Sequence, residues 1–222
     1  MEVRKVKSIL AACVPADTTF PWRTSKDPYG LVMAELMLIR TNAKQVVPVW
    51  DRFMKRFPNV KSLARAQAEE VEDNLADIGL WWRSRRIHSL AVEVAREHRG
   101  RMPRRVEELS ALLPTGGYVA KAAALQVAGR GDLPVDVGIA RFLARFNGLV
   151  VPKDARRTPA VLKRAKKSGT WTRQEFYGLI DLVRTKCGPR TALCGECPLQ
   201  RLCRYGTRKS RESALLNRVP TG

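Results

Sequence analysis

Histidine and cysteine are rare in this 222-residue chain, at two and five residues, and aromatic residues make up only 7% of it. Long apolar runs are also missing, because no stretch reaches the ~18 consecutive apolar residues that a membrane-spanning helix needs. The first twenty residues contain only a short apolar segment followed by a proline, so we expect neither a secretory signal nor a membrane partner. The length allows one large domain or two small ones.

Acidic residues are the minority charge, with 21 Asp and Glu against 41 Lys and Arg, which gives a net charge of +20. So large a positive excess favours a polyanionic partner. The basic residues are concentrated in several places, including Arg83–Arg105 with eight basic against two acidic residues and Lys153–Lys167 with seven against one. Each stretch taken alone is equally consistent with a solvated helix face, and the adjacent Trp81 and Trp82 either stack on the partner or pack in the core. Because the charge does not gather in one amphipathic stripe, the composition favours nucleic acid over an acidic membrane surface.

Strand-like alternation of apolar and polar residues is not evident anywhere in the chain. Apolar residues instead recur three and four positions apart, as in Leu31–Phe57 and Leu90–His98, which is the spacing of amphipathic helices. Proline and glycine interrupt this pattern and divide the chain into helices of about 8–20 residues. The sequence therefore predicts an all-α protein.

Four of the five cysteines lie within 17 residues near the C-terminus, at Cys187, Cys194, Cys197 and Cys203. An odd cysteine count without an export signal argues against a disulfide framework, so we expect a reducing, cytoplasmic environment and a metal or cluster site. Four closely spaced thiolates can hold a [4Fe-4S] cluster. Zinc is the alternative, but zinc ribbons usually present two close cysteine pairs, and here only Cys194 and Cys197 form one. The fifth, Cys13, lies in an apolar stretch and is expected to be a buried free thiol.

Two short helices flanking a glycine-rich turn are predicted between Val106 and Ala128. Val106–Leu113 has the pattern of one helix, Pro114–Gly117 that of a tight turn, and Tyr118–Ala128 that of an alanine-rich second helix. Glycine lets backbone N–H groups approach a phosphate closely, and the second helix presents its positive N-terminal end to the same anion. An ordinary turn between helices is the alternative. The candidate phosphate-binding residues of this helix-hairpin-helix pattern are Thr115, Gly116 and Gly117.

Two carboxylates stand in unusual apolar settings. Asp136 follows Gly117 by 19 residues and begins a helix, so it is expected to be an N-cap. A carboxylate held at a helix start can also stay ionised, stabilise a developing cation or activate water. Glu35 lies inside the apolar segment Val32–Leu38, where an unpaired carboxylate would be costly, so we expect it to face a polar pocket.

The order of hairpin, downstream aspartate and four-cysteine loop resembles that of the helix-hairpin-helix DNA glycosylases of the endonuclease III superfamily. The resemblance extends over nearly the whole chain, from Pro21-Trp22-Arg23 through Ile78-Gly79-Leu80 to the cysteines. It implies two α-helical lobes, with a six-helix barrel domain in residues 23–135 and an iron-sulfur domain in residues 1–22 and 136–222. It also implies a structural [4Fe-4S] cluster on the four cysteines, and a monomer that acts on double-stranded DNA carrying a damaged or mismatched base.

The resemblance also assigns roles to individual residues. Asp136 matches the family's catalytic carboxylate, and Glu35 matches a glutamate that adenine and thymine mismatch glycosylases place against the flipped base. The segment Ile39-Arg40-Thr41-Asn42 lies at the position of the family's wedge, which fills the gap left by the extruded nucleotide, and Ile39 and Arg40 are its candidate DNA-binding residues. Arg190, in the loop that the cluster would hold, is expected to contact DNA.

The branches of this family differ in the residue at the start of the second hairpin helix. It is lysine in glycosylases that are also lyases, serine in adenine glycosylases and tyrosine in archaeal-type thymine mismatch glycosylases. The hairpin of this chain is one residue shorter than the family pattern. Counting forward from the hairpin glycines therefore places Val119 at this position, whereas counting back from Asp136 places Tyr118 there. We assign Tyr118, because a deletion within a packed helix would rotate every later side chain by about 100°. The assignment implies a monofunctional glycosylase that removes thymine or uracil opposite guanine.

Three other interpretations stay open. An adenine glycosylase acting opposite 8-oxoguanine would carry a further C-terminal domain, whereas only 19 residues follow Cys203. A bifunctional glycosylase would need Lys121, three residues after Tyr118, as its Schiff-base nucleophile, although a phosphate contact is the simpler role for this lysine. A non-catalytic DNA-binding iron-sulfur protein is also consistent with the irregular hairpin.

Overall fold

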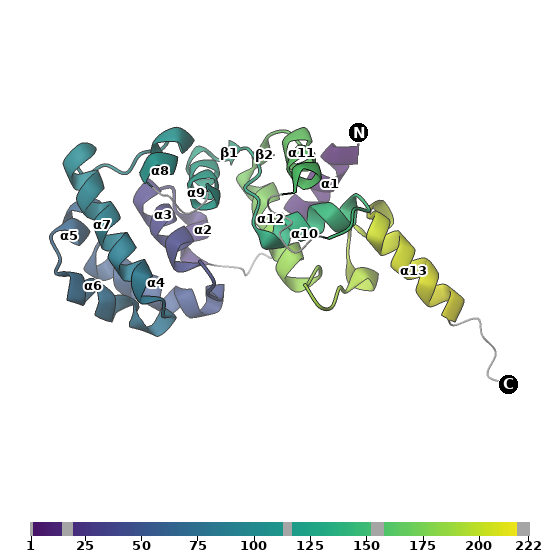
Figure 1. The fold of residues 1–222 in the computed structure, drawn as a ribbon, viewed down its shortest axis with the longest axis horizontal. Coiled ribbons are helices and arrows are strands. Elements are labelled where there is room, and N and C mark those ends of the chain that lie inside the picture. The colour runs from purple at the N-terminus through teal and green to yellow at the C-terminus, as the bar shows by residue number, and fades with distance from the viewer. Residues whose placement is uncertain (1, 15–19, 113–116, 152–157, 217–222) are drawn as a thin grey trace. The chain divides into compact units, whose positions relative to one another are not determined.

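The structure is a computed structural model that describes residues 2–14, 20–112, 117–151 and 158–216. This part of the chain is helical almost throughout, and its two strands have two residues each. Contacts divide the chain into two compact units, Ala16–Gly131, here called the hairpin unit, and Met1–Pro15 with Asp132–Gly222, here called the cysteine unit (Figure 1). Among the described residues, no helix is both long and apolar enough to cross a membrane.

The all-α prediction is confirmed, with the two short strands as exceptions. The elements of the hairpin unit are α2 (Pro21–Thr24), α3 (Pro28–Met37), α4 (Ala43–Arg56), α5 (Val60–Ala64), α6 (Ala68–Leu75), η1 (Ala76–Ile78), α7 (Trp81–Glu97), α8 (Val106–Leu112), α9 (Tyr118–Ala128) and β1 (Arg130–Gly131). Those of the cysteine unit are α1 (Glu2–Ala12), α10 (Val137–Phe146), α11 (Pro159–Lys167), β2 (Trp171–Thr172), α12 (Arg173–Thr185), η3 (Cys194–Glu196), η4 (Gln200–Leu202) and α13 (Arg204–Leu216).

Helix α3 lies inside the hairpin unit and is buried along its whole length. It begins after Asp27, whose carboxylate accepts hydrogen bonds from the backbone N–H groups of Tyr29 and Gly30 at 3.2 and 3.1 Å. Such a cap, followed by Pro28 as first residue, favours a helix start. A helix that is apolar on all sides must be surrounded by other elements, and α3 contacts α2, α4, α7 and α9. Glu35 therefore lies in the interior of this unit.

Helix α9 runs from Tyr118 to Ala128, as predicted. Gly117 and Gly129 flank it with φ angles of 76° and 75°, a left-handed conformation that glycine adopts without strain. Its buried face is rich in alanine, and these small side chains let the helix lie close to α3 and α8.

The first hairpin helix, α8, begins at Val106, as predicted, and is described as far as Leu112. Its expected last residue, Leu113, lies outside the described residues. The same is true of Thr115 and Gly116 in the turn. Of the three candidate phosphate-binding residues, only Gly117 therefore has a described conformation.

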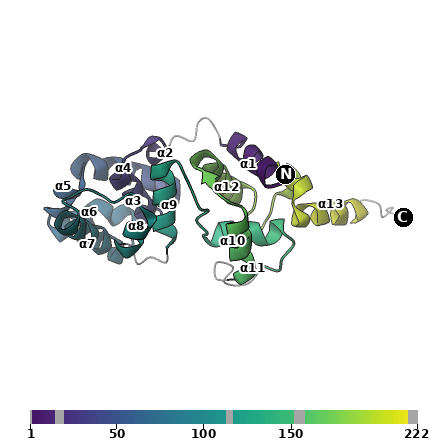
Figure 2. The ribbon, with the colours of Figure 1, turned by 90° about the horizontal axis from the view of Figure 1, so that it is seen from above.

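The N-terminal helix α1 lies alongside α12, far away in the sequence (Figure 2). The two helices approach so closely that a Cβ atom on Gly178 would lie 1.8 Å from the carbonyl oxygen of Leu10, so only glycine fits. Lys7 is buried in α1, and its ammonium group donates to the carbonyl oxygen of Thr170 at 2.6 Å and lies 4.7 Å from the centre of the Trp171 ring. These contacts join the first residues of the chain to the cysteine unit.

Helix α10 runs through the cysteine unit and connects its functional parts. Its buried residues include Ile139, Phe142 and Leu143, and it contacts α11, α12 and α13. Helix α13 extends away from the rest of its unit in both views (Figures 1 and 2). One rigid helix therefore carries both the aspartate at its N-terminus and the basic side chains that reach the cysteine loop.

Candidate active site and cysteine pocket

Asp136 immediately precedes α10 and caps it. Its backbone is extended, with φ −92° and ψ −176°, and its Oδ1 accepts a hydrogen bond from the backbone N–H of Ile139 at 2.6 Å. The N-cap prediction is therefore confirmed. The carboxylate therefore lies beside the partial positive charge of the helix N-terminus. The residue is only half-buried, so the carboxylate stays available to a partner.

Gly138 is a part of this site that the sequence patterns did not reveal. A Cβ atom at this position would lie 2.6 Å from Cγ1 of Val183 and 3.4 Å from Oδ1 of Asp136. Any side chain would therefore collide with α12 and crowd the carboxylate. The only sequence signal is a glycine two positions after the aspartate, in the first turn of a helix.

Glu35 and Gln126 form a buried polar pair between α3 and α9. Glu35 is 7% exposed and Gln126 is 1% exposed, and Nε2 of Gln126 donates a hydrogen bond to Oε1 of Glu35 at 2.5 Å. Buried polar groups need such partners, because an unpaired one is costly. The sequence pointed to Glu35 but not to Gln126, a lone polar residue in the apolar stretch Ala122–Ala128. Their pairing is not visible locally, since 91 residues separate them.

Tyr118 is the first residue of α9 and packs half-buried against the core of the hairpin unit. The competing residue, Val119, is buried, so its side chain belongs to the core. Lys121 lies almost one helical turn further along α9 and is exposed. Of the two candidates for the branch position, Tyr118 is therefore the one with accessible surface.

Arg40 and Leu80 hold left-handed backbone conformations, which residues other than glycine rarely adopt. Arg40, in the loop after α3, has a φ of 55°, and Leu80, just before α7, has a φ of 63°. Each such residue costs of order 1–3 kcal/mol, and strain of this kind concentrates at functional sites. A third, Arg99, follows the end of α7, where this conformation is common. Arg40 is exposed, as a wedge residue must be, whereas Ile39 is half-buried.

Trp81 begins α7 and is 69% exposed, so the core-packing alternative is wrong for this residue. Trp82 beside it is also exposed, though less so. The guanidinium group of Arg85 lies 5.1 Å from the centre of the Trp81 ring, in a cation–π contact. An exposed aromatic ring beside a cation suits stacking on nucleic-acid bases.

Arg83, also in α7, is 1% exposed and reaches the loop that carries Arg40. Its Nη2 donates to the carbonyl oxygen of Ile39 at 2.5 Å and to Oγ1 of Thr41 at 2.9 Å. Its backbone N–H donates to the carbonyl oxygen of Leu80 at 2.7 Å. Burial lowers the pKa of its guanidinium group. Within the described residues its Nε and Nη1 are buried without a hydrogen-bond partner, and each such group costs about 1–3 kcal/mol.

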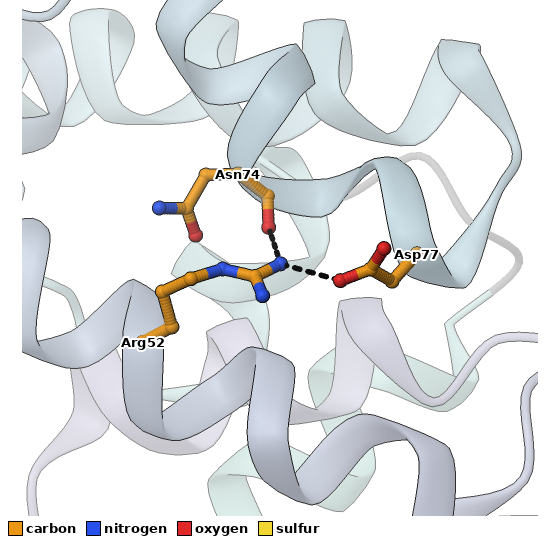
Figure 3. A network of polar contacts seen from close by, with 3 residues as sticks. All are labelled: Arg52, Asn74 and Asp77. Carbon is orange, nitrogen blue, oxygen red and sulfur yellow. Dashed lines mark hydrogen bonds and ion pairs between the residues drawn. The ribbon is translucent and has the colours of Figure 1, made fainter.

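The segment just before Leu80 is anchored by a second arginine. Figure 3 shows Arg52 of α4, whose Nη2 donates to the carbonyl oxygen of Asn74 at 2.7 Å and to Oδ2 of Asp77 at 2.9 Å. Both the arginine and the aspartate are exposed, so this ion pair contributes at most about 1 kcal/mol. Arg52 thus joins α4 to the end of α6 and to η1.

All four C-terminal cysteines line one pocket of about 370 Å³, a volume that includes space open to solvent. Their thiols are free, and apolar side chains such as Phe142 and Leu182 complete the lining. In the described part of the chain, no three Cys, His, Asp or Glu side chains stand close enough together to hold a single metal ion. Burial raises the pKa of three of these thiols, those of Cys194, Cys197 and Cys203.

Two arginines of α10 hold the start of the cysteine loop. Nε of Arg141 donates to the carbonyl oxygen of Cys187 at 2.9 Å. Nη1 of Arg145 donates to the carbonyl oxygen of Gly188 at 2.7 Å and to Sγ of Cys187 at 3.4 Å. Arg190, further along this loop, is exposed. The helix capped by the candidate catalytic carboxylate therefore also fixes the position of the first cysteine.

Comparison with known proteins shows which family this chain is similar to. The family model of the HhH-GPD superfamily base excision DNA repair proteins matches residues 33–167. A thymine-DNA glycosylase of Aeropyrum pernix is 33% identical over 198 residues, which cover 86% of this chain and 89% of the relative. The human adenine DNA glycosylase is 30% identical over 221 residues, but this chain spans only 38% of its length.

Solved structures share the fold. The structure of a thermostable thymine-DNA glycosylase matches with a TM-score of 0.83 and 25% identity, over 93% of this chain and 97% of that one. A non-covalent endonuclease III–DNA complex matches with a TM-score of 0.74 at 21% identity, over 94% and 97% of the two chains. The predicted endonuclease III-like fold is therefore confirmed. This chain belongs to the HhH-GPD superfamily of base excision DNA repair proteins and is a DNA glycosylase, an enzyme that hydrolyses N-glycosyl bonds.

Proposed function

We propose that this DNA glycosylase removes thymine or uracil mispaired with guanine from double-stranded DNA and leaves the abasic strand intact. The observation that carries this proposal is the start of α9, where Tyr118 is the half-buried first residue and neither candidate position holds a lysine. A tyrosine cannot form the Schiff base on which such a lyase depends. The similarity to a thymine-DNA glycosylase over 86% of this chain supports the same substrate class.

Asp136 is the proposed catalytic carboxylate. Breaking the N-glycosidic bond builds positive charge on the sugar, and a fixed carboxylate can stabilise that charge or activate a water molecule for attack. The N–H of Ile139 holds one oxygen in place, and the missing side chain of Gly138 leaves room beside it. The carboxylate is therefore oriented before the substrate arrives.

Glu35 is the proposed partner of the flipped base, which it binds or protonates. An extruded base is read by hydrogen bonds in its pocket, and a buried carboxylate offers them. Gln126 holds one oxygen of Glu35, so less rotational freedom has to be lost when the base binds. Arg40, together with Ile39, is proposed to fill the gap that the base leaves in the duplex.

The remaining proposed contacts are to DNA phosphates. Gly117 provides a left-handed turn at the positive end of α9, and Lys121 and Arg190 are exposed cations. Thr115 and Gly116 are proposed to complete the hairpin contact. We further propose that the protein acts as a monomer, and its charge of +20 should make DNA binding steeply salt-dependent.

We also assign a [4Fe-4S] cluster to the four C-terminal cysteines, Cys187, Cys194, Cys197 and Cys203. Four thiols around one pocket are the donor set that such a cluster requires. When bound, it has a structural role: it would order the iron-sulfur domain (residues 1–22 and 136–222), as distinct from the six-helix barrel domain (residues 23–135), and fix the loop of Arg190.

The cluster assignment is tested by metal analysis. Protein purified without oxygen should be yellow-brown and contain about four irons per chain. Serine at any of the four cysteines should lower the iron content, whereas Cys13→Ser, outside the pocket, should leave it unchanged. Stoichiometric zinc without iron would overturn the assignment.

Excision of adenine opposite 8-oxoguanine is the second candidate activity, because the human adenine DNA glycosylase is 30% identical. The start of α9 disfavours it, since the resemblance implies serine there in adenine glycosylases and this chain has Tyr118. A third candidate is a lyase that uses the exposed Lys121.

One assay separates these candidates. The protein is incubated with duplexes that carry T:G, U:G, A:8-oxoguanine or thymine glycol, and strand breaks are measured with and without alkali. We expect breaks in T:G and U:G only, and only after alkali. Breaks confined to A:8-oxoguanine would replace the proposed substrate. Breaks without alkali that Lys121→Gln abolishes would show a bifunctional enzyme.

A further inference from the structure

We propose that Arg83 is a positioning residue that holds the loop of Arg40 against the start of α7 before DNA binds. The proposal rests on the proposed role of Arg40 in filling the gap left by the extruded base. In the sequence, Arg83 looks like any other basic residue of the stretch Arg83–Arg105. Its burial and its partners set it apart.

The guanidinium group of Arg83 bonds to both neighbours of Arg40. It donates to the carbonyl oxygen of Ile39 at 2.5 Å and to the hydroxyl oxygen of Thr41 at 2.9 Å. The backbone N–H of Arg83 donates to the carbonyl oxygen of Leu80 at 2.7 Å. One residue therefore links two left-handed positions that lie far apart in the sequence, Arg40 and Leu80.

The burial of Arg83 points to a geometric role rather than to a contribution to stability. In the described part of the chain, its side chain bonds only to uncharged oxygen atoms, and its Nε and Nη1 lack a partner. A buried charge that is incompletely satisfied is unfavourable. The other buried positions of α7, such as Ile87 and Leu90, are mostly apolar, and an apolar residue would suit the interior here as well. The loop that Arg83 holds explains why an arginine is present.

Holding this loop prepares Arg40 for insertion. A left-handed conformation is unfavourable for arginine, so a loop released from Arg83 would relax toward ordinary backbone angles. Arg40 would then have to be ordered again while the duplex is opened, which makes extrusion of the base less favourable. Loss of Arg83 should therefore slow the extrusion of a paired base and leave cleavage of the N-glycosidic bond unchanged.

The test compares Arg83→Met and Arg83→Lys in the full-length protein. Single-turnover excision is measured on uracil paired with guanine, and on uracil opposite an abasic-site analogue, where no base pair has to be broken. Arg83→Met should be about 10- to 100-fold slower than the parent on the paired substrate and close to the parent on the unpaired one. Arg83→Lys keeps a donor for the carbonyl oxygen of Ile39 and should recover part of the loss.

Two control variants separate positioning from a general loss of stability. Leu90→Ala removes a buried side chain from the same helix, seven residues away from Arg83. Arg52→Met also removes a hydrogen bond from an arginine to a backbone carbonyl, but one that lies outside the loop of Arg40. Each should change excision from the paired and unpaired substrates by the same factor, and urea unfolding of all variants reports their stability.

A double-mutant cycle tests whether Arg83 acts through Arg40. In an Arg40→Ala background, Arg83→Met should have little further effect on the paired substrate, because the side chain that it positions is already gone. Independent effects of the two changes would overturn the proposal. So would equal losses on paired and unpaired uracil, or a parent-like rate of Arg83→Met on the paired substrate.

A spectroscopic measurement keeps this test separate from the choice of substrate. If the parent excises neither uracil, the proposed substrate fails, and 2-aminopurine placed beside the mismatch then reports unstacking of the duplex without any cleavage. Arg83→Met should reduce the fluorescence increase on binding, whereas an unchanged increase would overturn the role of Arg83.

Discussion

Replacing Asp136 by asparagine or by alanine should separate catalysis from helix capping. Both variants lose the negative charge, but only alanine also loses the acceptor that the N–H of Ile139 uses at 2.6 Å. Asparagine is as good an N-cap as aspartate, so Asp136→Asn should cost only the charge–dipole interaction, about 0.3–1 kcal/mol of unfolding free energy. Asp136→Ala also removes the cap, which by itself typically costs about 1 kcal/mol.

Excision should fall in both Asp136 variants by a similar factor. Removing one preorganised electrostatic stabiliser of a transition state typically costs about 10²–10³ in rate, or roughly 2.7–4 kcal/mol. The measurements are single-turnover excision from a U:G duplex, read as alkali-dependent strand breaks, together with DNA affinity and urea unfolding of the same preparations. A parent-like rate for Asp136→Asn would leave Asp136 as a helix cap only. Equal stability of the asparagine and alanine variants would refute the capping account.

Three further predictions concern the branch residue, the base pocket and a buried lysine. Tyr118→Lys should create lyase activity that borohydride traps, whereas Val119→Lys should only destabilise the protein, because Val119 is buried; trapping in the second variant would mean that the missing hairpin residue was placed wrongly. Gln126→Leu should slow excision, since it removes the hydrogen bond to Glu35, and a parent-like rate would separate Gln126 from the site. Burial lowers the pKa of Lys7 in the folded protein below its ordinary value of 10.5. Between these two pKa values the unfolded chain binds more protons than the folded chain, so the free energy of unfolding should rise with pH in that range. Urea unfolding of Lys7→Met should lack this rise.

The sequence by itself determined the features that depend on near neighbours in the chain. The bounds of α9 follow from the glycines on either side of it, and the cap at Asp136 follows from one acceptor three residues before its donor. The set of four cysteines was visible because all lie within 17 residues. In each case the interacting groups are fixed by spacing along the chain, so no knowledge of helix packing was needed.

Only the tertiary structure decided which polar and small residues meet across helices. Gln126 and Glu35 are 91 residues apart, and Arg83 is 44 residues from Ile39, so neither partner could be read from local spacing. Helical periodicity also did not decide whether Trp81 packs in the core or is exposed, and in the folded protein its side chain lies on the surface. Gly138 matters only because Val183 of α12 packs against it. All of these cases have the same physical reason. Burial and close contact depend on which faces of the helices pack together, and this packing is determined by parts of the chain that are distant in sequence.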